Sequence, residues 1–123
     1  MDFEEAVAHL AVKKGAEKDF PFGPEVLVFK VMGKMFALMG LDADPVSINL
    51  KCDPTRAEML RELFPAVTPG YHMNKKHWIT VTLDGSVPDE EVRAMMDDSY
   101  DLVVKGLGKA DRERLKGRGK GGG

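Results

Sequence analysis

Residues 77–83 read HWITVTL, and the alternation of side chains in this stretch decides the predicted fold. Every second residue after His77 is aliphatic, while Trp78 belongs to the other set with two threonines. Successive side chains of a β-strand point to opposite faces of the sheet. The stretch therefore predicts a strand with one buried face, which His77 shares, and with Trp78 on the outward, polar face.

Neighbouring stretches predict the rest of a sheet. Residues 46–52, VSINLKC, alternate in the same way and indicate another strand with one buried side. Residues 26–40, VLVFKVMGKMFALMG, are rich in β-branched and aromatic residues, which predicts two strands joined by a tight turn at Gly33. Residues 71–76, YHMNKK, place two lysines in a second predicted hairpin turn.

Three segments have the apolar spacing that is typical of an amphipathic helix. They span residues 2–14, 53–64 and about 88–104. The predicted order is α-β-β-β-α-β-β-α, which indicates an α+β domain with two layers, an antiparallel sheet of about five strands and helices on one face. This domain is expected to cover residues 1–107.

Composition favours a single domain in a reducing compartment. The chain has 123 residues, 43% of them hydrophobic, and Cys52 is its single cysteine, so no intramolecular disulfide forms. No apolar run approaches the roughly 20 residues that cross a bilayer, and the acidic N-terminus does not resemble a secretory signal. We therefore expect a cytoplasmic protein without membrane association.

The net charge of −2 is unevenly distributed. From Lys105 onward, seven basic residues accompany two acidic ones, so this end carries +5 and residues 1–104 carry −7. Residues 108–123 are basic and glycine-rich and are predicted to form a disordered tail. An acidic body does not attract a polyanion through its overall field, so nucleic-acid binding would depend on local patches or on the tail.

The sequence predicts no catalytic residue, no cofactor and no metal site. A phosphate-binding loop of the GxxxxGK[ST] type is absent. Cys52 falls in phase with the buried positions of its strand, which favours an inert thiol over a nucleophile. His72 and His77 could face each other across the second hairpin, with Cys52 as a third ligand, but no metal-binding spacing supports this arrangement.

The strongest candidates for function are the tips of the two predicted hairpins. The candidate residues are Lys30 and Lys34 at the first tip, and Asn74, Lys75, Lys76, His77 and Trp78 at the second. Lysine side chains at a hairpin tip can contact phosphates, and an outward aromatic ring can stack on bases. Exposed turns and edge strands also carry lysine for solubility alone, so a solvated turn is the alternative.

Several stretches together resemble the MmcQ/YjbR family of small bacterial proteins. They are TPGYHMNKKHWITVTLDG, VPDEEVRAMMDDSYDLVV, VFKVMGKMFALM and INLKCDPTRAEMLRE, and the resemblance covers about residues 1–107. Residues 74–78, Ser99 and Tyr100 are its most specific marks. The resemblance implies an α+β fold, described as frataxin-like or related to type III secretion chaperones, and a "double wing" DNA-binding role with the two hairpins as wings.

We therefore expect a non-enzymatic protein that binds DNA weakly, mainly through phosphate contacts from the hairpin lysines. The alternative is an adaptor that binds a protein or peptide on the open face of the sheet or along an exposed strand edge, as the chaperone-like fold suggests. A small hydrolase or metal protein is a third hypothesis, and it requires His72 and His77 to converge with an acidic side chain.

Overall fold

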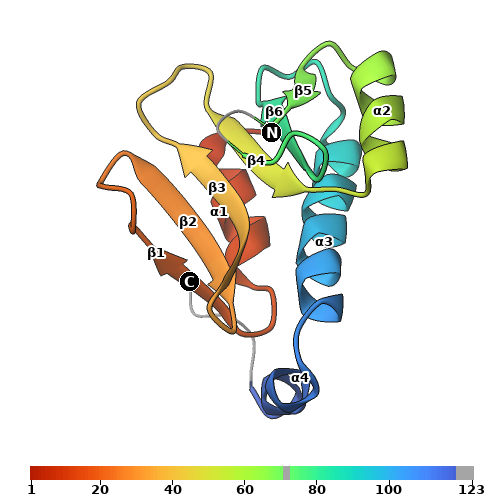
Figure 1. The fold of residues 1–123 in the computed structure, drawn as a ribbon. Coiled ribbons are helices and arrows are strands. Elements are labelled where there is room, and N and C mark those ends of the chain that lie inside the picture. Colours follow the sequence, from red (N-terminus) through yellow and green to blue (C-terminus); the bar gives the residue numbers. More distant parts are fainter. Residues whose placement is uncertain (71–72, 119–123) are drawn as a thin grey trace.

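The computed structural model describes residues 1–70 and 73–118, which form a six-stranded antiparallel sheet covered on one face by helices (Figure 1). The helices are α1 (Phe3–Ala11), α2 (Pro54–Leu63), α3 (Asp89–Lys105) and α4 (Lys109–Lys116). The strands are β1 (Ala16–Asp19), β2 (Val26–Val31), β3 (Lys34–Gly40), β4 (Ser47–Lys51), β5 (Val67–Pro69) and β6 (Trp78–Thr82), in the order β1-β2-β3-β4-β6-β5. This confirms the predicted α+β class.

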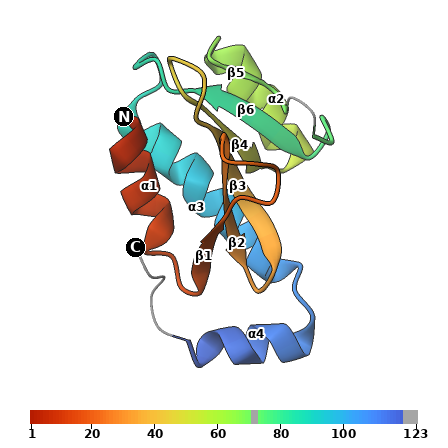
Figure 2. The ribbon, with the colours of Figure 1, turned by 90° about the vertical axis from the view of Figure 1, so that its left-hand side faces the viewer.

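The register of the sheet places aliphatic side chains opposite one another across five strands. The successive cross-strand partners on this face are Leu27, Met39, Ile48, Val81 and Val67, and all are buried. Helices α1 and α3 pack on this face, while α2 packs beside β5 (Figure 2). The opposite face, which we call the open face, carries the alternate residues of the same strands.

One strand and one helix were missed from the sequence. The segment of β1, AEKD, buries only Ala16 and pairs with β2 at the edge of the sheet, so it has no apolar alternation to detect. The prediction of disorder from residue 108 is wrong for Lys109–Lys116, which form α4. Residues 119–123 of the predicted tail lie outside the described residues.

Helix α4 is held by a close contact between residues far apart in the sequence. Leu115 is buried and packs over Gly15, where an added Cβ would lie 2.5 Å from Leu115 Cδ1. Gly15 also has a φ of +72°, a conformation that favours glycine. Arg118 Nη1 lies 3.0 Å from Glu17 Oε1 on β1. The end of the described chain is therefore docked on the turn between α1 and β1.

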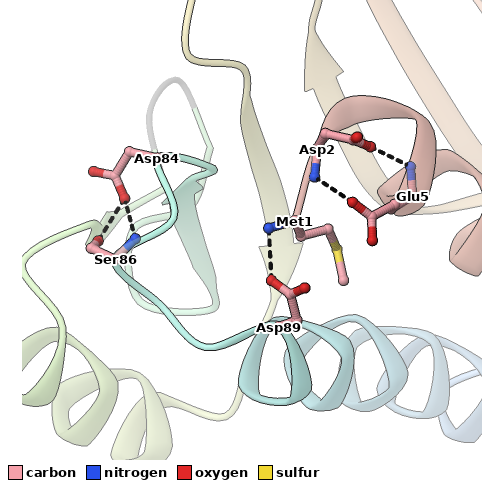
Figure 3. Close-up of polar contacts among 6 residues, drawn as sticks. All are labelled: Met1, Asp2, Glu5, Asp84, Ser86 and Asp89. Carbon is pink, nitrogen blue, oxygen red and sulfur yellow. Dashed lines mark hydrogen bonds and ion pairs between the residues drawn. The ribbon is translucent and has the colours of Figure 1, made fainter.

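The N-terminal ends of α1 and α3 are joined through polar contacts (Figure 3). The Asp2 carboxylate accepts from Glu5 N at 2.8 Å, and the Glu5 carboxylate accepts from Asp2 N at 3.3 Å, which makes a capping box for α1. The α-amino group of Met1 lies 2.6 Å from Asp89 Oδ1 in the first turn of α3. Asp84 accepts hydrogen bonds from Ser86 in the turn that leads into α3.

Ser99 is the only polar side chain that is fully buried in the described part of the chain. Its Oγ donates to Phe36 O at 2.6 Å and accepts from Lys51 N at 2.8 Å. Phe36 lies at a β-bulge, because Phe29 pairs with Ala37 and Lys30 with Met35, which leaves Phe36 without a cross-strand partner. One hydroxyl therefore satisfies two backbone groups, one at the bulge of β3 and one at the end of β4.

Tyr100 adds a second connection next to Ser99. Its ring lies edge-on to Phe36, with ring centroids 5.2 Å apart, and its hydroxyl donates to Lys14 O. Ser99 and Tyr100, two of the residues that mark the resemblance, thus join α3 to the sheet and to the turn after α1. No helix among the described residues is both long and apolar enough to span a bilayer.

Replacing Ser99 by alanine is expected to lower the free energy of unfolding by about 2–3 kcal/mol, because two buried backbone groups lose their partner. Urea denaturation monitored by circular dichroism measures the change. Thr55→Ala is the control, since Thr55 is exposed on α2 and its hydroxyl makes no hydrogen bond among the described residues, and it should cost about 0.5 kcal/mol or less. Equal stability of Ser99→Ala and wild type would contradict the assigned role.

Asp97 on α3 is expected to make stability depend on pH. Burial opposes its ionisation, but hydrogen bonds from Lys13 and His9 outweigh burial and hold its pKa below the ordinary value. Its stabilising effect is therefore complete above the unfolded-state pKa of about 3.9 and is lost as the pH falls through the lowered folded-state pKa.

Asp97→Asn should lower the free energy of unfolding by about 1 kcal/mol at pH 7, a modest value because the carboxylate is partly exposed. The difference from wild type should shrink as the pH falls below about 3.9. Urea denaturation at pH 7 and near pH 3 measures both values, with Asp101→Asn on the exposed side of α3 as the control. A loss of equal size at both pH values would argue against the ionic contribution.

Candidate ligand-binding surface

Asn74 builds the turn that precedes β6. Its Oδ1 accepts from Lys76 N at 3.0 Å, and its backbone oxygen accepts from His77 N and Trp78 N at 3.1 and 3.0 Å. An asparagine that bonds the backbone two residues later is typical of an Asx-turn. Lys75, Lys76 and His77 are exposed on this turn. Asn74, predicted as a DNA contact, uses its side-chain oxygen to shape the turn.

Trp78 is the first residue of β6 and lies on the open face, half-buried, as its alternation predicts. Lys51 is its cross-strand partner on the same face. Gly70 donates from its backbone nitrogen to Trp78 O at 2.9 Å, and a Cβ at Gly70 would lie 2.6 Å from Trp78 Cβ. Glycine at position 70 therefore allows the chain to pass directly over the tryptophan.

The position of His77 differs from the one that the sequence predicts. It was expected on the buried face of the strand, but it lies exposed in the turn before β6 begins. Its backbone oxygen accepts from Cys52 N at 2.8 Å, which extends the β4–β6 pairing by one residue. His72, its predicted partner in a hairpin or metal site, lies outside the described residues.

The first hairpin does not present two free lysines on one surface. Met32 and Gly33 have φ values of +50° and +80°, which fits a two-residue turn of type I′. Lys34 is the cross-strand partner of Val31 and shares its face, the one that α1 and α3 cover. Lys30 lies on the open face, so the two side chains point in opposite directions.

Lys30 is also paired with an acid. Its Nζ lies 2.9 Å from Asp19 Oδ2, and this hydrogen bond holds the pKa of Asp19 below its ordinary value. The two hairpins are separated in the sheet by β4, and both ribbon views show the β2–β3 tip well away from the start of β6 (Figures 1 and 2). The predicted wings are therefore two separate surfaces.

A hollow of about 570 Å³ on the open face was not predicted from the sequence. Its lining residues are Phe22, Val26, Leu38, Gly40, Asp42, Ser47, Asn49, Met73 and Thr80. The floor comes from β2, β3, β4 and β6, and the walls come from the β1–β2 loop and the turn before β6. Figure 2 shows the β1–β2 loop on the side of the sheet away from α1 and α3. Small-molecule sites typically occupy about 300–1,000 Å³, so the hollow, which we call the open-face groove, is large enough for a ligand.

The open-face groove combines apolar walls with unused polar groups. Asn49 Oδ1 accepts from Thr80 Oγ1, while the Asn49 amide nitrogen makes no hydrogen bond within the described residues. The same holds for the Ser47 hydroxyl and the Asp42 carboxylate in that part of the chain. Phe22 in the wall is 61% exposed. A loop with two phenylalanines among Pro and Gly is the sequence signal that could have indicated this site.

A second hollow, of about 310 Å³, lies between α2 and α3. Cys52 lines it, beside Arg56, whose Nε is 3.1 Å from Asp98 Oδ2. Burial raises the pKa of the Cys52 thiol, and none of the described lining residues is a histidine that could act as a base. Among the residues that the structure describes, no group of three or more His, Cys, Asp or Glu is placed to hold a metal ion.

Cys52 is expected to react slowly with a thiol reagent. The thiolate is the reactive form, and burial both hides the sulfur and disfavours ionisation, so the reaction at pH 8 should be at least about tenfold slower in the folded protein than in urea. The rate of colour release from Ellman's reagent measures this. Equal rates in the folded and unfolded states would restore Cys52 as a candidate nucleophile.

Known proteins resemble the chain over most of its length. The Escherichia coli (strain K12) "Uncharacterized protein YjbR" is 34% identical over 115 residues, which cover 94% of this chain and 98% of that protein. The "Uncharacterized protein YbdF" of Escherichia coli O157:H7 is 43% identical over 97 residues, 79% of this chain and 80% of that protein. Neither name assigns an activity.

A solved structure has the same fold. The crystal structure of Deinococcus radiodurans protein DR2400, with a DUF419 domain, matches with a TM-score of 0.88 and 42% identity, and the match covers 94% of this chain and 88% of that one. A family model described as YjbR matches residues 11–102. From this match and the similarity to its relatives, the chain belongs to the YjbR family.

Proposed function

We propose that this chain is a non-enzymatic, cytoplasmic protein that binds DNA weakly through phosphate contacts from the turn before β6. The observation that carries this proposal is the exposure of Lys75 and Lys76 and their lack of an acidic partner among the described residues. Both are exposed on a turn that Asn74 fixes, and no carboxylate among the described residues lies within ion-pair distance of either ammonium group. Two exposed cations without an acidic partner among the described residues, on a turn held by the hydrogen bonds of Asn74, are suited to contact adjacent phosphates.

The surroundings of the turn support the same interpretation. Trp78 follows the two lysines on the open face, and Lys51 lies across from it on β4. Base–aromatic stacking does not depend on sequence, because every base has a π-face. The exposed His77 lies between the lysines and the indole and can add a hydrogen bond. The turn and its neighbours thus combine charge with an aromatic surface.

The first hairpin has a smaller role in this proposal. Lys30 is neutralised by Asp19, so it would have to exchange a carboxylate for a phosphate. Lys34 is exposed but lies on a different surface from the second turn. We infer that Lys34 contributes at most a separate contact, and that Lys75 and Lys76 provide most of the affinity.

The open-face groove favours a second candidate function, an adaptor that binds a protein or peptide. Its apolar walls and exposed Phe22 would accept a side chain of the partner. The two functions differ in their response to salt. Phosphate binding weakens steeply as salt is added, with a log–log slope of about −0.9 per phosphate neutralised. Binding of an uncharged peptide in an apolar groove would not.

The double variant Lys75→Ala/Lys76→Ala should weaken duplex DNA binding about tenfold or more and reduce the magnitude of the salt slope by about 2, because two phosphate contacts are lost. Fluorescence anisotropy of a labelled duplex at several salt concentrations measures both quantities. The matched control is Lys109→Ala/Arg112→Ala, which removes two exposed positive charges from α4 and keeps residues that favour a helix.

Each outcome has a distinct meaning. If the first variant binds duplex as tightly as wild type, the turn is not the contact surface. If only the control loses affinity, the basic C-terminal region provides the binding. If wild type shows no salt-sensitive DNA binding, the adaptor function is favoured.

A further inference from the structure

We propose that the open-face groove holds one unpaired nucleobase of a single-stranded nucleic acid. This inference rests on the proposed function, because it assigns the base to the groove and the neighbouring phosphates to Lys75 and Lys76. It extends that function from the phosphate backbone to the base, and it predicts a preference for single strands over duplex.

The groove and the lysine turn share one segment of chain. Met73 lines the groove, and Lys75 and Lys76 follow it within the same turn. The path from the groove to the lysines is therefore short along the backbone, and Asn74 fixes this path through its hydrogen bonds to Lys76, His77 and Trp78. We therefore infer that a nucleotide whose phosphate contacts the lysines can reach the groove with its own base or with the next one along the strand.

The walls of the groove suit a flat, partly apolar ring. Phe22 comes from the β1–β2 loop and Met73 from the turn before β6, while Val26 and Leu38 belong to the strands of the floor. Single-stranded nucleic acids are commonly recognised by stacking of unpaired bases on aromatic side chains. Phe22 is a large aromatic side chain that is mostly exposed, so its ring is available for such stacking.

The polar groups of the groove match the edge of a base. The Asn49 amide nitrogen is a donor that the described residues leave unused, and the Asp42 carboxylate and Ser47 hydroxyl can accept. Asparagine and aspartate are side chains that bond base edges, the first to adenine and the second to the amino group of cytosine. Among the described lining residues Asp42 alone is charged, and its negative sign disfavours a phosphate in the groove itself.

A base within a duplex is stacked and paired, so it cannot enter the groove without being extruded, which costs free energy. The groove should therefore add affinity for a single strand and none for a duplex. An abasic strand of the same length retains the phosphates and lacks the bases, so it loses every base contact, that of the groove together with any stacking on Trp78. Wild type should bind the base-bearing strand about tenfold more tightly than the abasic strand.

The decisive pair of variants is Phe22→Ser and Phe20→Ser. Both phenylalanines are in the β1–β2 loop and both are exposed, at 61% and 47%, so neither change should unfold the protein. Only Phe22 lines the groove. Phe22→Ser should lower the affinity for the base-bearing strand several-fold, toward that for the abasic strand, and Phe20→Ser should leave both unchanged, as measured by fluorescence anisotropy at one low salt concentration.

A third variant blocks the groove directly. Gly40 lies on the floor between Val26 and Ser47, its φ is not in the left-handed region, and an added Cβ would meet only Asp42 Oδ1 at 3.9 Å. Gly40→Val therefore fills space without backbone strain and should give the same loss as Phe22→Ser. Thr82→Val, on the same face but outside the lining, is the control.

The outcomes separate this inference from the proposed function. Loss of single-strand affinity in Phe22→Ser and Gly40→Val, with duplex affinity unchanged, supports the base site. Equal binding of abasic and base-bearing strands, or no effect of either variant, overturns it while leaving phosphate binding by Lys75 and Lys76 intact. Absence of any nucleic-acid binding by wild type at low salt overturns both.

Discussion

Cross-strand packing of aliphatic side chains is the constraint on which the remaining structure depends. From Leu27 through Ile48 to Val67, each strand sets a buried side chain against the next one. A shift of one residue in any strand would exchange its two faces and place its aliphatic set in water. The register that buries this ladder under α1 and α3 is also the register that turns Asn49 and Trp78 to the open face.

The elements that could be predicted from the sequence are those whose own side-chain pattern shows which face is buried. The orientation of Trp78 followed from the alternation of its own strand, and so did the two-layer class. Strand β1 and helix α4 were missed because each has little apolar pattern of its own. Helix α4 is fixed by Leu115 on Gly15, one hundred residues away, and β1 by pairing with β2.

The candidate site also has one part that the sequence predicts and another that only the fold reveals. An exposed lysine turn can be found in the sequence, since turn residues and charges are neighbours there. The sequence does not reveal which lysines are paired or which way they point. Lys30 pairs with an aspartate on another strand, and the register turns Lys34 to the other face. The open-face groove was missed because Phe22 and Met73, its two walls, come together only when the sheet forms.

Charge pairing explains how an acidic body can retain a local cationic site. Residues 1–104 carry a net charge of −7, and several of their cations, including Lys13 and Lys30, are held by carboxylates. Among the described residues, no carboxylate lies within ion-pair distance of Lys75 or Lys76. Salt screens exposed charges over about 10 Å, so these two lysines attract phosphates at short range only. Such a weak attraction gives little discrimination by itself, and any selectivity must come from the surface beneath the turn, where Trp78 and the open-face groove lie.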